Sequence, residues 1–529
     1  SSPTTPNEPH GHGFVASFWT YFTACPVFDV NQPRFACPME LSSSVTSGRW
    51  RQFRHDPSLF SSLAVSSEPK TMQVLDRALP SIPRDTPYLV SPEFEYDVEL
   101  NAFFHSADML GSSISTRTGY ASDLLAFFNF LHVNRGGKDW RTATSDDHEA
   151  YFAWRREDPA GPRVATSTWD REVAATNRFF NWQVRRGVLS ENPIPQRRRR
   201  AHRQRRVGGV SRETTPATHS HGSGRTRVDW LPASSYRRWR DIGLRGYRTD
   251  GRLDDGFRGR WATRNATFAD MMVRTGLRLS EQSNLIESEL PTLVQLNGFH
   301  RFYLPRVIAK GSSERWVYVP STVLRAVREY VETDRREVIE LARSAGRYRL
   351  TPDSLILEPD GRHARLAGSS QRIPFGLLSL EERRRTFVEG RDGIAPASLW
   401  LSEAGEPMSV STWKHIFRQA NIRCRRNSLA LSASPHTLRH SFAVITLEQL
   451  QRGHIAALRS ATPEQRGYYV RVFGDPLDWV RRLLGHRSVE TTQKYLHALA
   501  DLEMSTRLTL IPEEWEDPRD PTLIAAGLS

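Results

Sequence analysis

The sequence predicts a mainly α protein: a small helical domain followed by a larger mixed, mostly α domain that contains a small β-hairpin or sheet. The chain has 529 residues, which is too long for one hydrophobic core, so two or three domains are expected. Two long stretches place apolar residues at helical spacing. Only one short stretch combines the alternation of strands with a turn. Helices should therefore dominate both domains.

Residues 1–92 are expected to form an N-terminal extension of unknown role. They are rich in Pro, Ser and His and show weak periodicity, which predicts loosely packed accessory structure. Cys25, Cys37, His10 and His12 lie there without paired C-x-x-C spacing, so a zinc site is the less favoured interpretation. The three cysteines of the chain do not make a disulfide framework, which predicts a reducing compartment.

Residues 93–195 should form the small helical domain. One helix carries an apolar stripe at positions i, i+4, i+7, i+8 and i+11, formed by Tyr120, Leu124, Phe127, Phe128 and Leu131. A second helix is expected after the N-cap cluster at 144–147, and a third ends near Gly187. This pattern predicts the fold of the domain but not its ligand.

A basic segment, residues 196–228, is expected to link the two domains. Its arginine run and its Gly, Ser, Thr and His cannot pack a core. The chain carries 73 Lys and Arg against 59 Asp and Glu, for a formal net charge of +14, which predicts a polyanionic partner such as double-stranded DNA. The linker is either a strap along the phosphate backbone, which we favour, or a solvated tether. Its candidate DNA-binding residues are Arg197, Arg198, Arg199, Arg200, Arg203, Arg205 and Arg206.

Residues 229–512 should form the larger domain, and residues 513–529 a C-terminal tail. One hairpin is clear, because residues 302–309 and 316–319 flank a Lys-Gly-Ser-Ser turn. The polar stretch 340–395 is expected to be loop-rich and to be an insertion between elements of this domain.

Two motifs of the larger domain place cations at turns. In T-G-L-R-L-S-E at 275–281, a helix ends at Gly276 and Arg278 projects from the turn, with Glu281 close enough to orient its guanidinium. Alone, this pair fits a structural role as well as a functional one. Lys310 lies at the hairpin tip, where a lysine is usually solvated. Only five of the 73 basic residues are lysines, and a lysine can serve as a general acid where arginine cannot, which favours a chemical role.

A third motif, S-P-H-T-L-R-H, starts a helix at Ser434. His436 and Arg439, at i and i+3, share a face of its first turn, where free N–H groups and the helix dipole favour a phosphate. His440 also stands at metal-pair spacing from His436. The zinc-protease pattern H-E-x-x-H needs a glutamate where Thr437 stands, so no metal is expected.

The fourth motif is L-G-H followed by a helix with a tyrosine. Gly485 ends one helix, Ser488 caps the next, and Tyr495 lies within it. A single helical tyrosine is normally a half-buried core residue. The presence of the other three motifs and of His486 in the same chain favours a catalytic role for Tyr495.

In this order, T-G-L-R-x-S-E, K-G-x-x-x-R-x-V-x-V-P, H-T-L-R-H-S-F-A and L-G-H with a tyrosine nine residues after the histidine resemble the motifs of the tyrosine recombinase (phage integrase) family. The resemblance covers roughly residues 95–505. It implies that residues 93–195 are a core-binding domain and that 229–512 are the catalytic domain. The long gap from Lys310 to His436 fits an insertion.

The resemblance implies roles for five residues around a scissile phosphate. Arg278 and Arg439 would clamp its non-bridging oxygens, with Glu281 in support. His436 and His486 would add hydrogen bonds and assist proton movement. The guanidiniums of the two arginines would stabilise the negative charge that grows on the phosphate in the transition state.

The resemblance further implies that Tyr495 attacks phosphorus to give a 3′-phosphotyrosine, and that Lys310 protonates the departing 5′ oxygen. The covalent link would conserve the energy of the phosphodiester, so neither ATP nor a metal nor another cofactor is expected.

The resemblance also implies double-stranded DNA as the partner and a homo-oligomer, a tetramer, assembled on it. The segment after Leu502, with Leu508, Ile511 and Trp515, either docks on a neighbouring protomer or packs on its own domain. Since no apolar run could span a membrane and no secretory signal is present, a cytoplasmic, DNA-associated bacterial protein is expected.

Three other functions compete with a recombinase. A type IB topoisomerase would use the same chemistry but act alone and relax supercoils. A catalytically inactive DNA-binding relative would keep the fold, although all six expected catalytic positions are filled. A metalloenzyme that uses the His-rich segments is the third, and a metal analysis of the purified protein would decide it.

Overall fold

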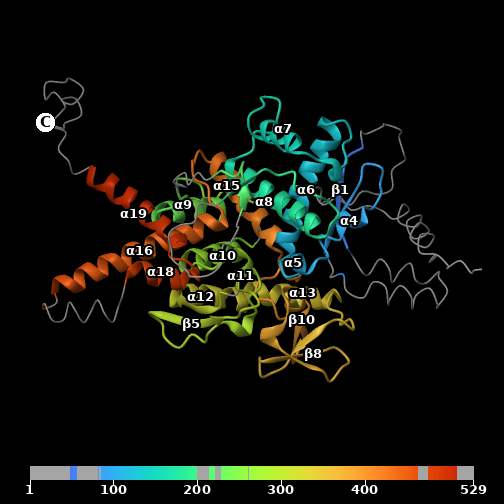
Figure 1. Cartoon of the computed structure of the whole chain (residues 1–529). Helices are drawn as coiled ribbons and strands as arrows, with labels where there is room; N and C mark the ends of the chain where they lie inside the picture. Colours follow the sequence, from blue (N-terminus) through green and yellow to red (C-terminus); the bar gives the residue numbers. More distant parts are fainter. Residues whose placement is uncertain are drawn as a thin grey trace, which may run out of the picture. The chain divides into compact units, whose positions relative to one another are not determined.

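The computed structural model describes residues 48–55, 82, 85–198, 214–220, 228–259, 261–311, 313–460, 462 and 475–508 (Figure 1). The chain divides into two compact units, residues 1–223 and 224–529. The predicted mainly α class is confirmed, because helices supply most of the regular structure in both units. None of the helices in the described ranges combines the length and hydropathy of a membrane span.

Two long stretches of the first unit form the helices α6 and α8, whose aromatic faces make up much of its core. Phe127 of α6 meets Phe180 of α8 edge-on at 6.0 Å and Tyr151 of α7 at 5.1 Å. Thr144 caps α7 with its capping-box partner Asp147, as the sequence predicts. The helices of this unit are α4 (Val98–Asn101), α5 (Ala107–Leu110), α6 (Ile114–Asn134), the 3₁₀ helix η3 (Trp140–Thr142), α7 (Ser145–Arg156) and α8 (Thr166–Arg185).

The first unit begins earlier than residue 93, where the sequence placed its start. Strands β1 (Arg51–Arg54) and β2 (Pro87–Val90) pair antiparallel, and Leu89 of β2 is fully buried in the helical core. The backbone N–H and C=O of Leu89 bond to the side-chain amide of Asn101 at 2.7 and 2.8 Å. Because the strands are short and far apart in sequence, they leave no hairpin pattern to predict them.

The expectation that residues 196–228 lack ordered structure is wrong for their described parts. Strand β3 (Gln196–Arg198) pairs antiparallel with β4 (Thr214–Pro216). Beyond β4, the indole of Trp169 donates to the carbonyl of Thr218 at 2.9 Å, and the hydroxyl of Ser220 donates to Asp170 at 2.6 Å. Hydrogen bonds to the helical unit order these residues without a hydrophobic core of their own.

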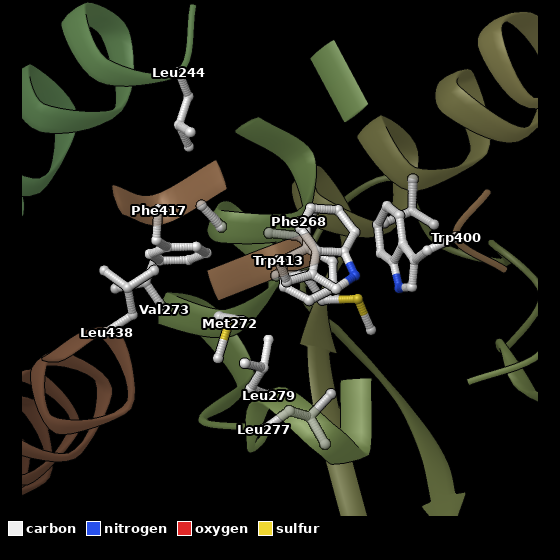
Figure 2. Packing of buried hydrophobic residues seen from close by; sticks show 14 of the residues in the cluster. Leu244, Phe268, Met272, Val273, Leu277, Leu279, Trp400, Trp413, Phe417 and Leu438 are labelled. Atoms are coloured by element: carbon white, nitrogen blue, oxygen red, sulfur yellow. The ribbon is translucent and has the colours of Figure 1, made fainter. Parts of the chain in front are cut away.

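The second unit is built around α10 (Ala262–Thr275). Phe268 of α10 stacks on Trp413 with ring centroids 3.5 Å apart, and Trp400 meets Phe268 edge-on at 5.1 Å (Figure 2). The same cluster takes in Leu277 and Leu438, which precede two of the candidate arginines (Figure 2). Aromatic burial of this kind dominates core energetics. The core therefore fixes the points from which Arg278 and Arg439 project.

The other elements of the second unit follow in chain order. They are α9 (Ala233–Gly243), α11 (Leu279–Ser283), the 3₁₀ helix η4 (Glu287–Glu289), β5 (Phe299–Leu304), β6 (Arg315–Pro320), α12 (Ser321–Tyr330), the π-helical turn η5 (Val331–Arg335), α13 (Arg336–Ser344), α15 (Val410–Arg426), α16 (Pro435–Ser460), α18 (Pro476–Leu484) and α19 (Glu490–Leu508). Strands β5 and β6 form the predicted hairpin, with Tyr303 opposite Trp316. The first strand ends at Leu304 and does not run to residue 309, because Pro305 has no N–H to continue the ladder.

The loop-rich character expected for residues 340–395 is wrong, because they hold most of a five-stranded sheet, in which Figure 1 labels β8 and β10. The strand order is β11-β10-β7-β8-β9. Strands β10 and β7 are parallel and the other pairs are antiparallel. Strands of three to five residues are too short to show alternation, which hid them. The elements are β7 (Leu355–Leu357), β8 (His363–Leu366), β9 (Arg372–Pro374), the 3₁₀ helix η6 (Phe375–Leu377), α14 (Leu380–Arg384), β10 (Thr386–Gly390) and β11 (Gly393–Pro396).

The predicted start of α16 is confirmed. The hydroxyl of Ser434 accepts from the N–H of Thr437 at 3.1 Å, and Pro435 opens the helix. The chain that enters the second unit is tied to this turn, because Thr437 donates to Asp229 at 3.1 Å and Leu231 donates its N–H to Ser441 at 2.8 Å. The first turn of α16 is thus held in place from outside the helix.

Candidate active site

The first motif places Arg278 beside a buried carboxylate. Helix α10 ends at Gly276 with a left-handed φ of 66°, and Arg278 precedes α11. Its Nη1 donates to Oε1 of Glu281 at 2.6 Å, and its backbone N–H donates to Oε2 at 2.9 Å. The side chain of Glu281 is wholly buried, whereas that of Arg278 is 19% exposed. The buried carboxylate of Glu281 therefore orients the guanidinium of Arg278, whose exposed part remains open to a ligand.

Gly276 itself should tolerate no side chain. A Cβ there would overlap the ring of Phe442, and the left-handed backbone disfavours any residue but glycine. Gly276→Ala should lower the unfolding free energy by about 1–2 kcal/mol for the backbone and by about 1–3 kcal/mol more for the overpacking. Gly346→Ala is the matched control, because Gly346 has a similar φ of 64° with open space around its Cβ position. Thermal unfolding, followed by tryptophan fluorescence, should show a larger loss of stability for Gly276→Ala than for Gly346→Ala. Equal losses of stability would contradict the steric argument.

The second candidate arginine lies deeper. Arg439 in the first turn of α16 is 4% exposed, and it donates to the backbone carbonyls of Gly276 and Leu484. The bond to Leu484 is 2.6 Å long. These carbonyls end α10 and α18, the helices of the first and fourth motifs. Arg439 therefore fastens three of the motifs together.

The hairpin tip with Lys310 is held against this cluster. Ser313 donates to the carbonyl of Lys310 at 2.9 Å and accepts from Nη1 of Arg278 at 3.3 Å. Arg487, which follows L-G-H in the fourth motif, donates to the carbonyl of Gly311. Lys310 is exposed and acts electrostatically on His436. The tip therefore brings a cation to the open side of the site.

Tyr495 lies at the centre of the third and fourth motifs. It is 1% exposed, and its hydroxyl is 2.9 Å from Nδ1 of His440. The ring of His486 lies nearly parallel to the tyrosine ring, with centroids 6.2 Å apart. Nδ1 of His486 bonds to the hydroxyl of Thr492 at 3.0 Å, one turn before the tyrosine. Both histidines are thus held by partners at Nδ1.

The electric field of the site keeps its histidines neutral. Burial and the neighbouring cations lower the pKa of His440 to about 4 and that of His486 to about 3, and lower the pKa of His436 as well. Burial raises the pKa of Tyr495 to about 12, against the pull of Arg439. At neutral pH the phenol is protonated beside an imidazole that can accept its proton.

Burial, with the other cations, lowers the pKa of Arg439 to about 9, so that its guanidinium is still charged at neutral pH. The cluster therefore presents cations with a single buried carboxylate, Glu281, among them. An anion would relieve the repulsion between these cations. A phosphate group fits this charge pattern.

All six predicted catalytic residues and Glu281 thus converge, and three further residues join them that the sequence does not single out for catalysis. The sequence indicates His440 only as a possible metal ligand, although its place in H-T-L-R-H puts it one turn after His436. Lys494 places its ammonium 5.1 Å from the centroid of the Tyr495 ring, and its rarity in this chain was a usable signal. Arg315 joins Glu281 from the hairpin.

The linker arginines are placed only in part. The backbone of Arg197 and Arg198 lies in β3, and Arg197 is exposed. The other five, Arg199, Arg200, Arg203, Arg205 and Arg206, lie outside the described residues, as do the N-terminal His and Cys positions and the tail residues Ile511 and Trp515. DNA contact by these arginines stays a prediction.

A metal-ligand geometry occurs away from the site. Among the described residues, Glu358, Asp360 and His363 bring ligand atoms within 4.8 Å of one another. Arg372 already donates to Glu358 and to Asp360, the latter at 3.5 Å. The guanidinium supplies the positive charge there, so these residues form an ion-pair network.

Two family models match the chain. The phage integrase N-terminal SAM-like domain matches residues 109–187, and the phage integrase family matches residues 258–450. The second range contains Arg278, Lys310 and Arg439, and ends before Tyr495. The position of the tyrosine therefore rests on its motif and on the geometry above.

Curated relatives carry the name tyrosine recombinase. XerD of Corynebacterium glutamicum is 36% identical over 139 residues, which cover 25% of this chain and 36% of the relative. XerD of Bifidobacterium longum is 24% identical over 407 residues, which cover 76% and 92%. Among solved structures, the XerH site-specific recombinase bound to a palindromic difH substrate has a TM-score of 0.43 at 13% identity, covering 78% of this chain and 88% of that one. A lambda integrase dimer bound to a COC′ core site has a TM-score of 0.40 at 12% identity, covering 75% and 93%.

Proposed function

The chain belongs to the phage integrase family of tyrosine recombinases, and we propose that it is a site-specific recombinase that cuts and rejoins DNA through a covalent link to Tyr495. One observation carries the choice of nucleophile. The buried hydroxyl of Tyr495 bonds to the neutral imidazole of His440, and although burial raises the pKa of the phenol to about 12, the charges of Arg439 and Arg278 oppose that rise. A tyrosine that served only the core would have no need of this surrounding charge.

In the proposed reaction the two arginines hold the non-bridging oxygens of one phosphodiester. The Oη of Tyr495 attacks phosphorus, and the bond from phosphorus to the 5′ oxygen breaks. A phosphorane-like transition state gathers negative charge, which preorganised guanidiniums stabilise without reorientation. His436 and His486 donate hydrogen bonds to the same oxygens. The product is a 3′-phosphotyrosine and a free 5′ hydroxyl, which can reseal the strand by the reverse path.

Two proton transfers accompany the attack. His440 accepts the phenolic proton, since its Nδ1 is already 2.9 Å from the hydroxyl. The negative charge of the bound phosphodiester offsets the cationic field, so the pKa of the histidines rises when DNA binds. Lys310 gives a proton to the 5′ oxygen from the open side.

Lys310→Ala should therefore slow cleavage by about 10²- to 10⁴-fold, the usual contribution of a general acid. A 5′-bridging sulfur in place of the oxygen should restore a rate close to that of the wild type, because a thiolate leaves without protonation. Single-turnover cleavage of both substrates measures this. Arg278→Ala is the contrast, since sulfur should not rescue a lost phosphate clamp. Equal rescue of both variants, or of neither, would remove Lys310 from the acid role.

The function is tested with DNA selected by binding from a randomised duplex library. The selected duplex, nicked at successive positions, traps a covalent complex because the released fragment diffuses away. The proposal expects an adduct that survives denaturation, forms in EDTA without ATP, and leaves a free 5′ hydroxyl. A strand cut with no protein attached would overturn it.

We further propose that double-stranded DNA is the partner and that protomers assemble on it, up to a tetramer. Site-specific exchange between two duplexes requires more than one cut, and each chain offers one candidate tyrosine site. Native mass measurement of the DNA complex should give several protomers per pair of duplexes. Relaxation of supercoiled plasmid by a single bound protomer, without exchange, would favour a topoisomerase instead.

A further inference from the structure

Glu281 is shared between two guanidiniums. Its Oε1 accepts from Nη1 of Arg278 at 2.6 Å and from Nη1 of Arg315 at 3.3 Å. Its Oε2 accepts from the backbone N–H of Arg278 at 2.9 Å and from Nη2 of Arg315 at 2.8 Å. Burial works against these bonds, which nevertheless hold the pKa of Glu281 at about 2. The carboxylate is charged and its two oxygens are fully used.

Arg315 is occupied in a different way from Arg278. Its side chain is 6% exposed, its Nε donates to the carbonyl of Leu483 at 2.9 Å, and its Nη1 also donates to the carbonyl of Ser313 at 3.2 Å. A side chain on Gly485 would press on the Arg315 guanidinium, with its Cβ 3.2 Å from Nη1. Arg315 thus has its donors turned inward, between the hairpin and the turn before His486, and is not placed to hold a substrate.

We propose that Arg315 is a positioning residue, which acts through Glu281 to keep Arg278 oriented and its charge available for the scissile phosphate. One carboxylate between two guanidiniums leaves one positive charge in excess. Without Arg315, Glu281 would pair with Arg278 alone and neutralise it. The inference rests on the proposed function, because that function supplies the scissile phosphate. The ion triad of Arg278, Glu281 and Arg315 is shown by the geometry alone.

The test is a double-mutant cycle in the full-length chain. Arg315→Met should slow single-turnover formation of the covalent complex, at saturating selected duplex, by about 10- to 100-fold, the range of coupling between contacting groups. In a Glu281→Gln background the same change should slow it by less than about threefold, because no carboxylate is left to capture Arg278. Equal slowing in both backgrounds would overturn the proposal and leave Arg315 a purely structural residue.

Arg335→Met is the matched control for the loss of a buried arginine. Arg335 is 7% exposed on its side chain, pairs with Glu287 at 2.7 Å and donates to backbone carbonyls of Pro396 and Ser398, outside the site. Its loss should lower thermal stability as Arg315→Met does, with a cleavage rate within about twofold of the wild type. If it slows cleavage as much as Arg315→Met, stability rather than positioning explains both.

A second readout needs no cleavage. In the Tyr495→Phe protein, inorganic phosphate is titrated while the Nε–H resonance of Arg278 is followed by NMR. Adding Arg315→Met should weaken phosphate binding by about tenfold, through the lost excess charge. Unchanged affinity would overturn the inference even if covalent DNA forms as proposed. Weakened affinity without any covalent DNA would keep the inference and reject the proposed reaction.

Discussion

Replacing Tyr495 by phenylalanine is expected to abolish covalent attachment to DNA while leaving DNA binding intact. The ring packs with Val444, Leu447 and Leu484, and these contacts are kept in the variant. Only the hydroxyl is lost, with its bond to His440, at a stability cost of about 1 kcal/mol. Because the proposed reaction assigns the nucleophile to this hydroxyl, the fall in adduct should reach the detection limit.

Tyr330→Phe is the matched control for the Tyr495 variant. Tyr330 is also 1% exposed and its hydroxyl accepts a hydrogen bond, from the N–H of Leu401 at 3.1 Å. It lies in the core of the same unit and faces no member of the site. Adduct yield on the nicked duplex should match the wild type for Tyr330→Phe. Persistent adduct in Tyr495→Phe would end the assignment of the nucleophile.

Replacing Arg439 by lysine should lower the cleavage rate by about 10³-fold, the upper end of the usual loss for one oxyanion donor, although the charge is kept. The guanidinium bonds to the carbonyls of Gly276 and Leu484 and must also hold the phosphate. A single ammonium cannot bond to both carbonyls and to the phosphate in the same geometry, and it presents no planar fork to the phosphate oxygens. Single-turnover cleavage at saturating DNA separates this loss from weaker binding.

Arg264→Lys provides the comparison. Arg264 is 5% exposed and donates to the carbonyl of Leu401 at 2.7 Å, in a different part of the same unit. Its replacement should reduce stability and leave the cleavage rate of the folded protein near that of the wild type. If Arg439→Lys cleaves as fast as Arg264→Lys, charge alone suffices and the clamp geometry proposed for Arg439 is wrong.

The sequence predicts the mainly α class and singles out residues that the structure brings together, but it misses several of the smaller elements and contacts. Arg278 and Arg439 each stand beside a terminal glycine or an N-cap, which places the side chain at the end of an element, and Lys310 lies in a turn. Tyr495 lies inside α19, and its local signal is the L-G-H turn that precedes the helix. Local signals of this kind do not depend on distant contacts. The partnership of His440 with Tyr495 joins residues 55 positions apart, and no local pattern reveals it.

What the sequence could not predict depends on long-range pairing. Strands β1 and β2 are four residues each, and those of the five-stranded sheet are three to five, so each shows too little periodicity to be separated from loops. Arg315 is an informative intermediate case. It belongs to the K-G-x-x-x-R-x-V-x-V-P motif, but its partners Glu281 and Leu483 lie 34 and 168 positions away in the chain, beyond the reach of any local pattern.

The most direct measurement of the central claim is the chemical identity of the linked residue. After trapping on the nicked duplex, nuclease digestion leaves a short 3′-phosphonucleotide on the protein, and trypsin cuts after Lys494 and Arg507. Mass spectrometry should then find the peptide of residues 495–507 carrying the nucleotide on Tyr495. A nucleotide on any other residue, or one attached through a 5′ phosphate, would contradict the account.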